Sequence, residues 1–176
     1  MSKRPIGKVD HIGIAVPDMD QAVQLFHEIL GGRFLNGGDN DTTGIRLVHF
    51  DFPGFKIELM QPLRDDSILA ESIRKRGPGF HHLTFMVDDV AKTVEYLHTH
   101  DLPTTGTDLS SANWSETFLR PSATFGALLQ FVSSQLRWDV PNEAVSLEDV
   151  LAGKVVWQDY IACLRPGATT PTTHPQ

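Results

Sequence analysis

The chain has 176 residues, 40% of them hydrophobic and 21% charged, which is typical of a soluble globular protein that buries a core without disulfides. Its formal net charge of -7 at pH 7 argues against nucleic acid as a partner, because such proteins present clustered Lys and Arg. We expect neither a secretory signal nor a membrane span, and therefore a cytoplasmic protein without a membrane partner.

The first predicted elements are a strand and a helix. Residues 9–16 alternate with a period of two, which predicts a strand. Asp18 or Asp20 is a good N-cap residue for the helix that follows. Residues 43–52 and 55–60 predict two further strands, and there is room for one more before them. The first half is therefore predicted as a βαβββ module.

The second half repeats the first, after a polar bridge with a short predicted helix at 67–76. His82 falls on His11, and Gln130 falls on Glu58, when the halves are set one beneath the other. The segments that align are 9–26 with 80–97 and 55–60 with 127–132. Such an internal repeat predicts two modules with the same order of elements.

The fold prediction follows from this repeat. We predict an α+β domain over residues 1–135, built from two tandem βαβββ modules at about 8–62 and 79–133 that form a curved mixed sheet. The remaining 41 or so residues leave the repeat and form a C-terminal extension.

The extension carries its own signals. Ser146 is a candidate N-cap for a short helix, and residues 136–164 are predicted as a helical extension. Its aromatic residues indicate packing against the body or a partner. Cys163 is the single cysteine, which excludes a disulfide or a cysteine-based zinc site within the chain. Residues 165–176 are rich in Pro and Thr and are predicted to be disordered.

Strand parity selects the candidate site. Because side chains alternate faces along a strand, residues of equal phase converge. His11, Glu58, His82 and Gln130 occupy repeat-equivalent positions of one phase. Two imidazoles, a carboxylate and an amide oxygen suit one divalent metal ion, such as Zn, Ni, Co, Mn or Fe. Each residue alone has a structural interpretation, as a hydrogen-bonded strand histidine or an edge residue, and this alternative stays open.

At these residues the sequence resembles the vicinal oxygen chelate superfamily, which includes glyoxalase I, methylmalonyl-CoA epimerase, extradiol dioxygenases and antibiotic-resistance proteins. The likeness is to the epimerase and glyoxalase I branch. It rests, in chain order, on "DHIGIAVPD", "IELMQPL", "DDSILAESIRKRGPGFHHLTFMVDD" and "RPSATFGALLQF".

The resemblance implies a metal-binding cleft between the modules and carries the ligand role onto His11, Glu58 and His82, with Gln130 at the fourth position. It also implies an isomerase, epimerase or lyase that acts next to a carbonyl through a metal-stabilised enolate. The superfamily usually carries Glu at the fourth position, where it is implicated as the base. Gln130 can ligate through oxygen but cannot take a proton, so the catalytic role falls to Glu58.

Four further residues are candidates for substrate binding. Arg46 and His49 lie on a neighbouring strand with opposite parity, so at most one faces the cleft. Trp114 and Arg120 flank the last hairpin. Ordinary surface pairing or loop packing is the alternative for each. The substrate is expected to be a small molecule, an acyl thioester or a carboxylate.

Three classes of function remain open at this point. The first is the metal-dependent isomerase or lyase, an enzyme of the glyoxalase or epimerase type. The second is an Fe(II) ring-cleaving dioxygenase, which needs two histidines and one carboxylate. The third is a small-molecule-binding protein of the resistance type, without catalysis. The resemblance also implies a homodimer.

Overall fold

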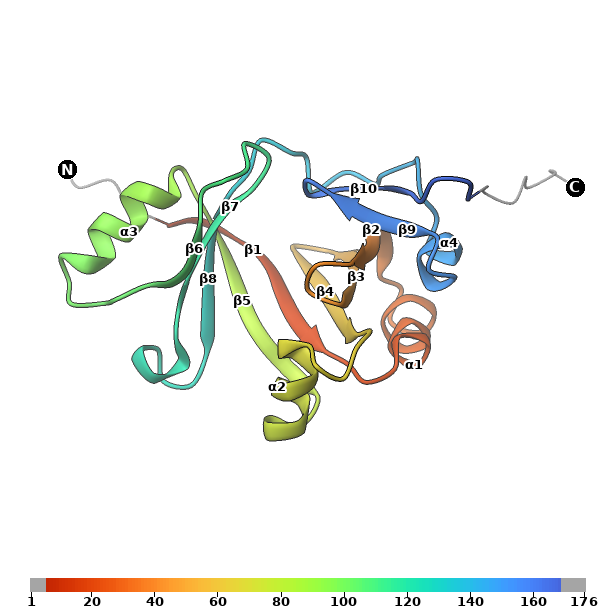
Figure 1. Cartoon of the computed structure of the whole chain (residues 1–176), viewed down its shortest axis with the longest axis horizontal. Helices are drawn as coiled ribbons and strands as arrows, with labels where there is room; N and C mark the ends of the chain where they lie inside the picture. The colour runs from red at the N-terminus through yellow and green to blue at the C-terminus, as the bar shows by residue number, and fades with distance from the viewer. Residues whose placement is uncertain (1–5, 169–176) are drawn as a thin grey trace, which may run out of the picture.

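The structure, a computed structural model, describes residues 6–168 of the chain. It has the predicted α+β class, with ten strands in one curved mixed sheet of order β10-β9-β2-β3-β4-β1-β5-β8-β7-β6 (Figure 1). Most of the tail that the sequence predicts to be disordered, residues 169–176, lies outside the described part. No helix in that part is long and apolar enough to span a membrane.

The two βαβββ modules are confirmed. The first contains β1 (Ile6–Ala15), α1 (Met19–Val23) with a π-helical continuation (Gln24–Ile29), β2 (Arg33–Asn40), β3 (Ile45–Phe52) and β4 (Phe55–Pro62). A bridging helix, α2 (Ile68–Arg76), follows. The second contains β5 (Gly79–Val87), α3 (Val90–His98), β6 (Thr105–Asp108), β7 (Ser115–Leu119), a 3-10 turn (Pro121–Ala123) and β8 (Leu128–Ser133).

The helices begin where the sequence provides a capping side chain. The Asp18 carboxylate accepts a hydrogen bond from the backbone N–H of Gln21, and Asp89 does the same for Lys92. These bonds satisfy backbone donors that the first helical turn leaves without a partner. Each helix follows one of the equivalent strands β1 and β5, and the two helices lie on opposite sides of this strand pair in Figure 1.

The centre of the sheet is the pair β1 and β5, which run antiparallel to each other. β1 is also parallel to β4, and β5 is parallel to β8, so each central strand is flanked by the last strand of its own module. His11 lies opposite Thr84, and Gly13 lies opposite His82. This register brings the two repeat-equivalent histidines to adjacent strands.

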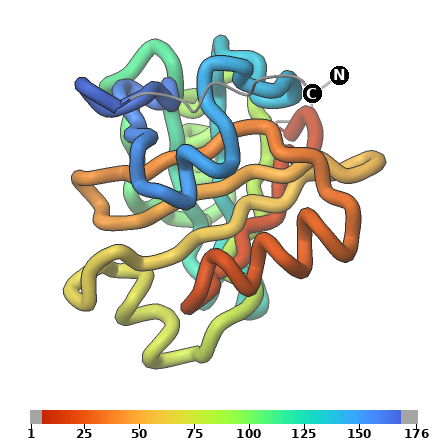
Figure 2. Tube along the Cα trace, turned by 90° about the vertical axis from the view of Figure 1, so that its right-hand side faces the viewer, coloured from red at the N-terminus to blue at the C-terminus, as the bar shows by residue number. Residues whose placement is uncertain are grey.

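The extension differs from the prediction. It contains the helix α4 (Leu147–Leu151), capped by Ser146 as expected, but also two strands, β9 (Val155–Gln158) and β10 (Ile161–Leu164). β9 pairs with β2 and adds a hairpin to the sheet, which Figure 2 shows in blue beside the orange strands of the first module. Strands of four residues without a repeat partner are too short for periodicity to reveal.

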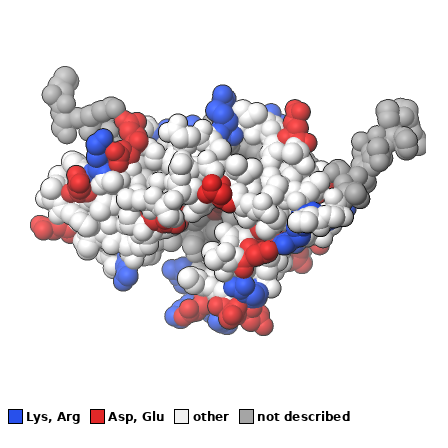
Figure 3. All heavy atoms as spheres, turned by 45° about the horizontal axis from the view of Figure 1, so that its top comes forward, with Lys and Arg blue, Asp and Glu red and all other residues white. Residues whose placement is uncertain are grey.

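The extension shares a core with the first module. Val150 and Val155 are fully buried in one apolar cluster with Val48 and Phe50, onto which α1 also packs. A second cluster lies between α3 and the strands β7 and β8. At the surface, the face in Figure 3 carries acidic and basic side chains interspersed. Residues 145–164 of the extension therefore contribute to the core of the first module.

This packing makes a prediction about stability. Val150→Ala removes apolar volume from the shared core and should lower the free energy of unfolding by about 2 kcal/mol. Val140→Ala, at a half-exposed position of the extension, should cost less than about 0.5 kcal/mol. Chemical denaturation followed by circular dichroism measures both. A separate early transition in Val150→Ala, with the main transition unmoved, would contradict the shared core.

Candidate metal centre

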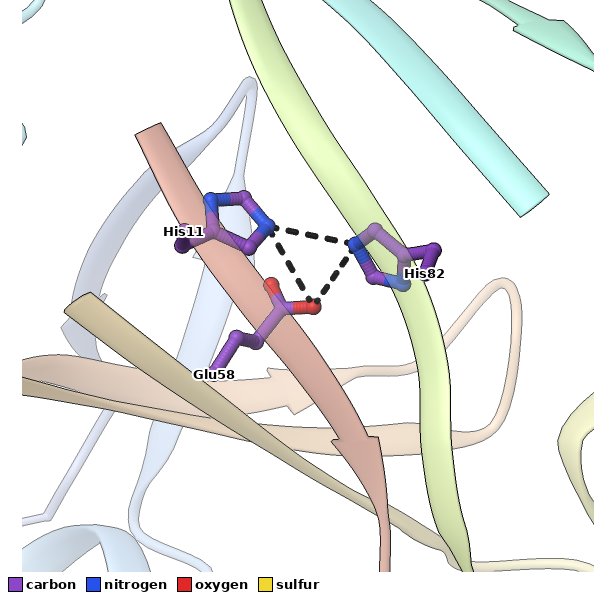
Figure 4. A group of neighbouring side chains, drawn as sticks. All are labelled: His11, Glu58 and His82. Atoms are coloured by element: carbon purple, nitrogen blue, oxygen red, sulfur yellow. Dashed lines mark hydrogen bonds and ion pairs between the residues drawn. The ribbon is translucent and has the colours of Figure 1, made fainter. Parts of the chain in front are cut away.

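Three side chains from three adjacent strands converge at the centre of the sheet (Figure 4). His11 comes from β1, Glu58 from β4 and His82 from β5, and all three are buried. The Nε2 atoms of the two histidines are 3.2 Å apart. Oε2 of Glu58 lies 3.7 Å from Nε2 of His11 and 3.6 Å from Nε2 of His82.

A glycine makes room for this convergence. Gly13 lies opposite His82 on β1, and a Cβ atom there would stand 2.2 Å from Cε1 of the His82 ring. No side chain fits at that distance, so the imidazole occupies the space above the Gly13 backbone. The repeat-equivalent position in the second module holds Thr84, whose hydroxyl approaches Nε2 of His11 to 2.9 Å. The two histidines are therefore related by the repeat, whereas their neighbours Gly13 and Thr84 differ.

The outer nitrogen of each histidine is held by a neighbour. Nδ1 of His11 donates to the Asp10 carboxylate at 2.9 Å, and Lys56 pairs with the same carboxylate at 2.9 Å. Burial alone would raise the pKa of Asp10, but the His11 hydrogen bond and the Lys56 charge lower it to about 2. Asp10 therefore stays ionised and turns the Nε2 lone pair of His11 toward the cluster. Nδ1 of His82 contacts Nδ1 of His81 at 3.1 Å.

The electrostatics of the cluster suit a cation. Burial opposes ionisation of Glu58, but the charge of His11 and the hydrogen bond from His49 hold its pKa well below its usual range. Burial lowers the pKa of His82 to about 3, so this ring is neutral at physiological pH. The ionised Glu58 and the neutral His82 are in the protonation states that metal ligands need.

The spacing of the cluster also fits one ion. Two ligands about 2.1 Å from a shared ion stand about 3.0–3.4 Å apart. The separation of 3.2 Å between His11 and His82 falls in this range, and Glu58 needs only a small approach. His11, Glu58 and His82 are thus the residues that would hold a divalent metal.

Gln130, predicted as the fourth ligand, lies beside the cluster with its amide engaged. Its Oε1 accepts from the hydroxyl of Thr84 at 2.6 Å, and its Nε2 donates to Glu116 at 2.7 Å. Because the hydroxyl of Thr84 also approaches His11, a polar chain runs from Glu116 through Gln130 and Thr84 to the cluster. Gln130 in this conformation links Glu116 to the histidines.

Sequence reasoning missed Glu116. This residue of β7 lines the same cavity, and its Oε2 accepts from both Trp114 Nε1 and Gln130 Nε2. Burial raises the pKa of the Glu116 carboxyl, although both hydrogen bonds act in the opposite direction. Its parity was a usable signal, since Trp114, Glu116 and Phe118 alternate along one strand and all face the cavity.

The four predicted substrate-binding residues separate into two pairs. His49 and Trp114 line the cavity, and His49 contacts Oε1 of Glu58 at 3.0 Å. Arg46 lies on the other face of β3, where it binds Asp39 and the backbone carbonyl of Leu151. Arg46 and His49 are three residues apart on β3, so their side chains point to opposite faces of the sheet. Arg120 is exposed, binds Thr105 and does not line the cavity. Neither arginine is therefore placed to bind a substrate there.

The cavity itself measures about 510 Å³ and opens above the cluster. It exposes His49, Glu58, His82, Glu116 and Gln130 together. A volume of this size accepts a compact organic molecule. The site thus combines a carboxylate–histidine cluster, a second carboxylate and an open cavity for a small molecule.

Tandem βαβββ modules around a central histidine and carboxylate cluster define a class of small-molecule enzymes and binding proteins. The family model of the Glyoxalase/Bleomycin resistance protein/Dioxygenase superfamily matches residues 10–118. The chain belongs to this superfamily.

Several proteins of similar sequence are methylmalonyl-CoA epimerases. The ethylmalonyl-CoA/methylmalonyl-CoA epimerase of Cereibacter sphaeroides is 33% identical over 86 residues, which cover 48% of this chain and 64% of the relative. The human mitochondrial methylmalonyl-CoA epimerase is 31% identical over 90 residues, covering 51% of each protein. The chain thus spans about half to two thirds of these relatives.

Solved structures agree with this branch. The crystal structure of methylmalonyl-CoA epimerase from Mycobacterium tuberculosis matches with a TM-score of 0.68 and 30% identity, over 77% of this chain and 93% of that one. A methylmalonyl-CoA epimerase in complex with methylmalonyl-CoA and NH4+ matches with a TM-score of 0.65 and 26% identity, over 74% of this chain and 96% of that one.

The contact between Gly13 and His82 can be tested by a double-mutant cycle. Gly13→Ala should destabilise the fold by about 1–3 kcal/mol, because the new methyl group displaces the imidazole. In a His82→Ala background the same change should cost much less, since the ring is gone. Urea denaturation measures all four proteins. Equal costs in both backgrounds would show that the ring does not occupy this space.

Burial of Glu116 predicts a pH effect. The folded chain holds the Glu116 proton to a higher pH than the unfolded chain, so the stability linked to this proton is lost as pH rises above 4.5. Glu116→Gln keeps an acceptor for Trp114 and Gln130 without the charge. The variant should gain stability over the wild type between pH 4 and pH 7, measured in thermal melts with a chelator present. Glu143→Gln, at an exposed position, is the control and should track the wild type. Parallel curves for Glu116→Gln and the wild type would contradict the burial.

Proposed function

We propose that the protein is a metal-dependent isomerase of the epimerase type, which moves a proton at a carbon next to a carbonyl group. The observation that carries the proposal is the buried cluster of His11, Glu58 and His82, of which Glu58 and His82 line one cavity with a second carboxylate, Glu116. The relatives named as methylmalonyl-CoA epimerases support this reaction type.

The cluster would hold the metal ion. His11, Glu58 and His82 present two nitrogens and one oxygen, which suit Zn, Ni, Co, Mn or Fe. A bound divalent ion would polarise a carbonyl oxygen and stabilise the negative charge that develops there when the neighbouring carbon loses a proton. Asp10 fixes the His11 ring, and His49 fixes Glu58 by a hydrogen bond to its other oxygen.

Glu116 is the group that we propose takes the proton. Glu58 is poorly suited, because His11 and His49 keep its pKa low and a ligand role occupies its oxygens. Burial gives Glu116 a higher pKa than an exposed glutamate has, which favours proton transfer near neutral pH. Gln130 and Trp114 donate to one oxygen of Glu116 and hold the carboxylate at the cavity wall. The catalytic role expected for Glu58 thus moves to Glu116.

Deuterium exchange tests this function. The metal-loaded protein should catalyse uptake of deuterium from D₂O at the carbon next to the carbonyl of methylmalonyl-CoA or of simple ketones, followed by mass spectrometry. Glu116→Gln should reduce the exchange rate by a factor of about 10²–10⁴, the usual contribution of a general base. His98→Ala, at an exposed histidine, is the matched control and should exchange normally. Absence of exchange into every probe would contradict the proposal.

A second candidate is an Fe(II) ring-cleaving dioxygenase. Two histidines and one carboxylate form the ligand set that Fe(II) oxygenases use, and the cluster has this composition. Oxygen consumption by the Fe(II)-loaded protein with catechol is the distinguishing measurement. Uptake would favour the dioxygenase, and its absence together with deuterium exchange would favour the isomerase.

A further inference from the structure

Four aromatic side chains form one wall of the cavity, and most of them come from the extension. Trp138, Trp157 and Tyr160 lie in residues 136–164, beyond the stretch that the family model matches, and Trp114 precedes β7. The rings contact one another in sequence. Trp157 stacks on Trp138 with ring centroids 5.7 Å apart, and Tyr160 stacks on Trp114 at 5.8 Å. Trp114 and Trp138 meet edge to face at 5.0 Å.

The indole N–H groups of the three tryptophans in this wall are already hydrogen-bonded. Nε1 of Trp157 donates to the carbonyl of Gly38 at 3.0 Å, and Nε1 of Trp138 donates to the hydroxyl of Ser134 at 2.8 Å. Nε1 of Trp114 donates to Glu116. What the three indoles still offer to a ligand is therefore their apolar surface.

The backbone at Tyr160 shows that its side chain is specifically placed. Asp159 and Tyr160 form the β9–β10 turn, and both have positive φ, of 46° and 63°. Such a turn favours Asn and Gly, and a tyrosine adopts this conformation at a cost. Asn113 and Ser111 of the second module bind the Asp159 carboxylate and hold the turn against the cavity. A strained turn that carries a large aromatic side chain into a cavity indicates a binding role.

The charges of the cavity restrict its ligand. Among the described residues that line it there is no Lys and no Arg, whereas three carboxylates, Glu58, Asp108 and Glu116, are present. A negatively charged group away from the metal would find no cationic partner there. The phosphates of a coenzyme A ester would have to stay outside.

We infer that the extension makes this cavity a binding site for a substrate whose non-reacting part is a flat, uncharged aromatic ring. All four rings line the cavity, and another aromatic ring packs against such rings by offset stacking or edge to face. A quaternary ammonium ion is the competing ligand chemistry for aromatic side chains, and the test below separates it from an aromatic ring. The inference rests on the proposed function only for the reacting end, a carbonyl group.

Binding of four small ketones to the zinc-loaded protein tests the inference. Phenylacetone carries an aromatic ring, cyclohexylacetone a saturated ring of similar size, 5-oxohexanoate a negative charge away from the carbonyl group and (trimethylammonio)acetone a positive charge. All three tryptophans of the chain line the cavity, so quenching of tryptophan fluorescence reports its occupancy. Phenylacetone should bind about threefold to tenfold more tightly than cyclohexylacetone, and more tightly than either ion.

Variants of the wall sharpen the test. The ratio of the two Kd values, phenylacetone to cyclohexylacetone, is measured by calorimetry within each variant, so that a general loss of stability cancels. Trp157→Leu and Tyr160→Leu should bring this ratio toward one, while Tyr160→Phe should leave it unchanged. Phe125→Leu is the matched control, because Phe125 is fully exposed and does not line the cavity.

The outcomes are distinguishable from those that test the proposed function. Equal or tighter binding of cyclohexylacetone, 5-oxohexanoate or (trimethylammonio)acetone would overturn the inference, even if deuterium exchange occurs. A ratio that the wall variants leave unchanged would overturn it as well. Selective binding of phenylacetone without deuterium exchange would uphold the aromatic site and contradict the isomerase.

Discussion

The antiparallel pairing of β1 and β5 is the constraint on which the rest of the structure depends. Its register sets Gly13 opposite His82 and Thr84 opposite His11, and this brings two histidines from the two modules to a separation of 3.2 Å. A shift of one residue would turn either imidazole to the helix-covered face. The pseudo-symmetry of the modules thus pairs two histidines at the centre of the sheet. Gly13 beside His82 and Thr84 beside His11 give the two histidines different surroundings.

Buried charge is the second feature that the fold supports. Burying a charge without a partner costs several kcal/mol, and each buried carboxylate at the centre has partners. Asp10 binds Lys56 and the His11 ring, whereas Glu58 lies among histidines only. Within residues 6–168, Glu116 receives hydrogen bonds but has no positively charged partner, and burial raises its pKa. A cation at the cluster would compensate Glu58 and leave Glu116 as the basic group of the cavity.

Much of this could be predicted from the sequence, because the internal repeat carries the information twice. It predicted the order of elements, the Asp18 cap and the phase that brings His11, Glu58 and His82 together. It could not predict that Gln130 turns its amide to Thr84 and Glu116. Strand parity predicts the face of the sheet on which a side chain lies, but it does not predict the rotamer of that side chain. The strands of the extension have no repeat partner, and their pairing with β2 arises only from tertiary packing.

The central claim is that the cluster holds one divalent metal ion, and metal content measures it most directly. Protein purified without added metal is analysed by inductively coupled plasma mass spectrometry, beside His82→Ala and the exposed control His98→Ala. The account predicts about one equivalent per chain in the wild type and in His98→Ala, and loss of the metal in His82→Ala. Absence of metal in the wild type even after reconstitution, or an unchanged content in His82→Ala, would contradict it.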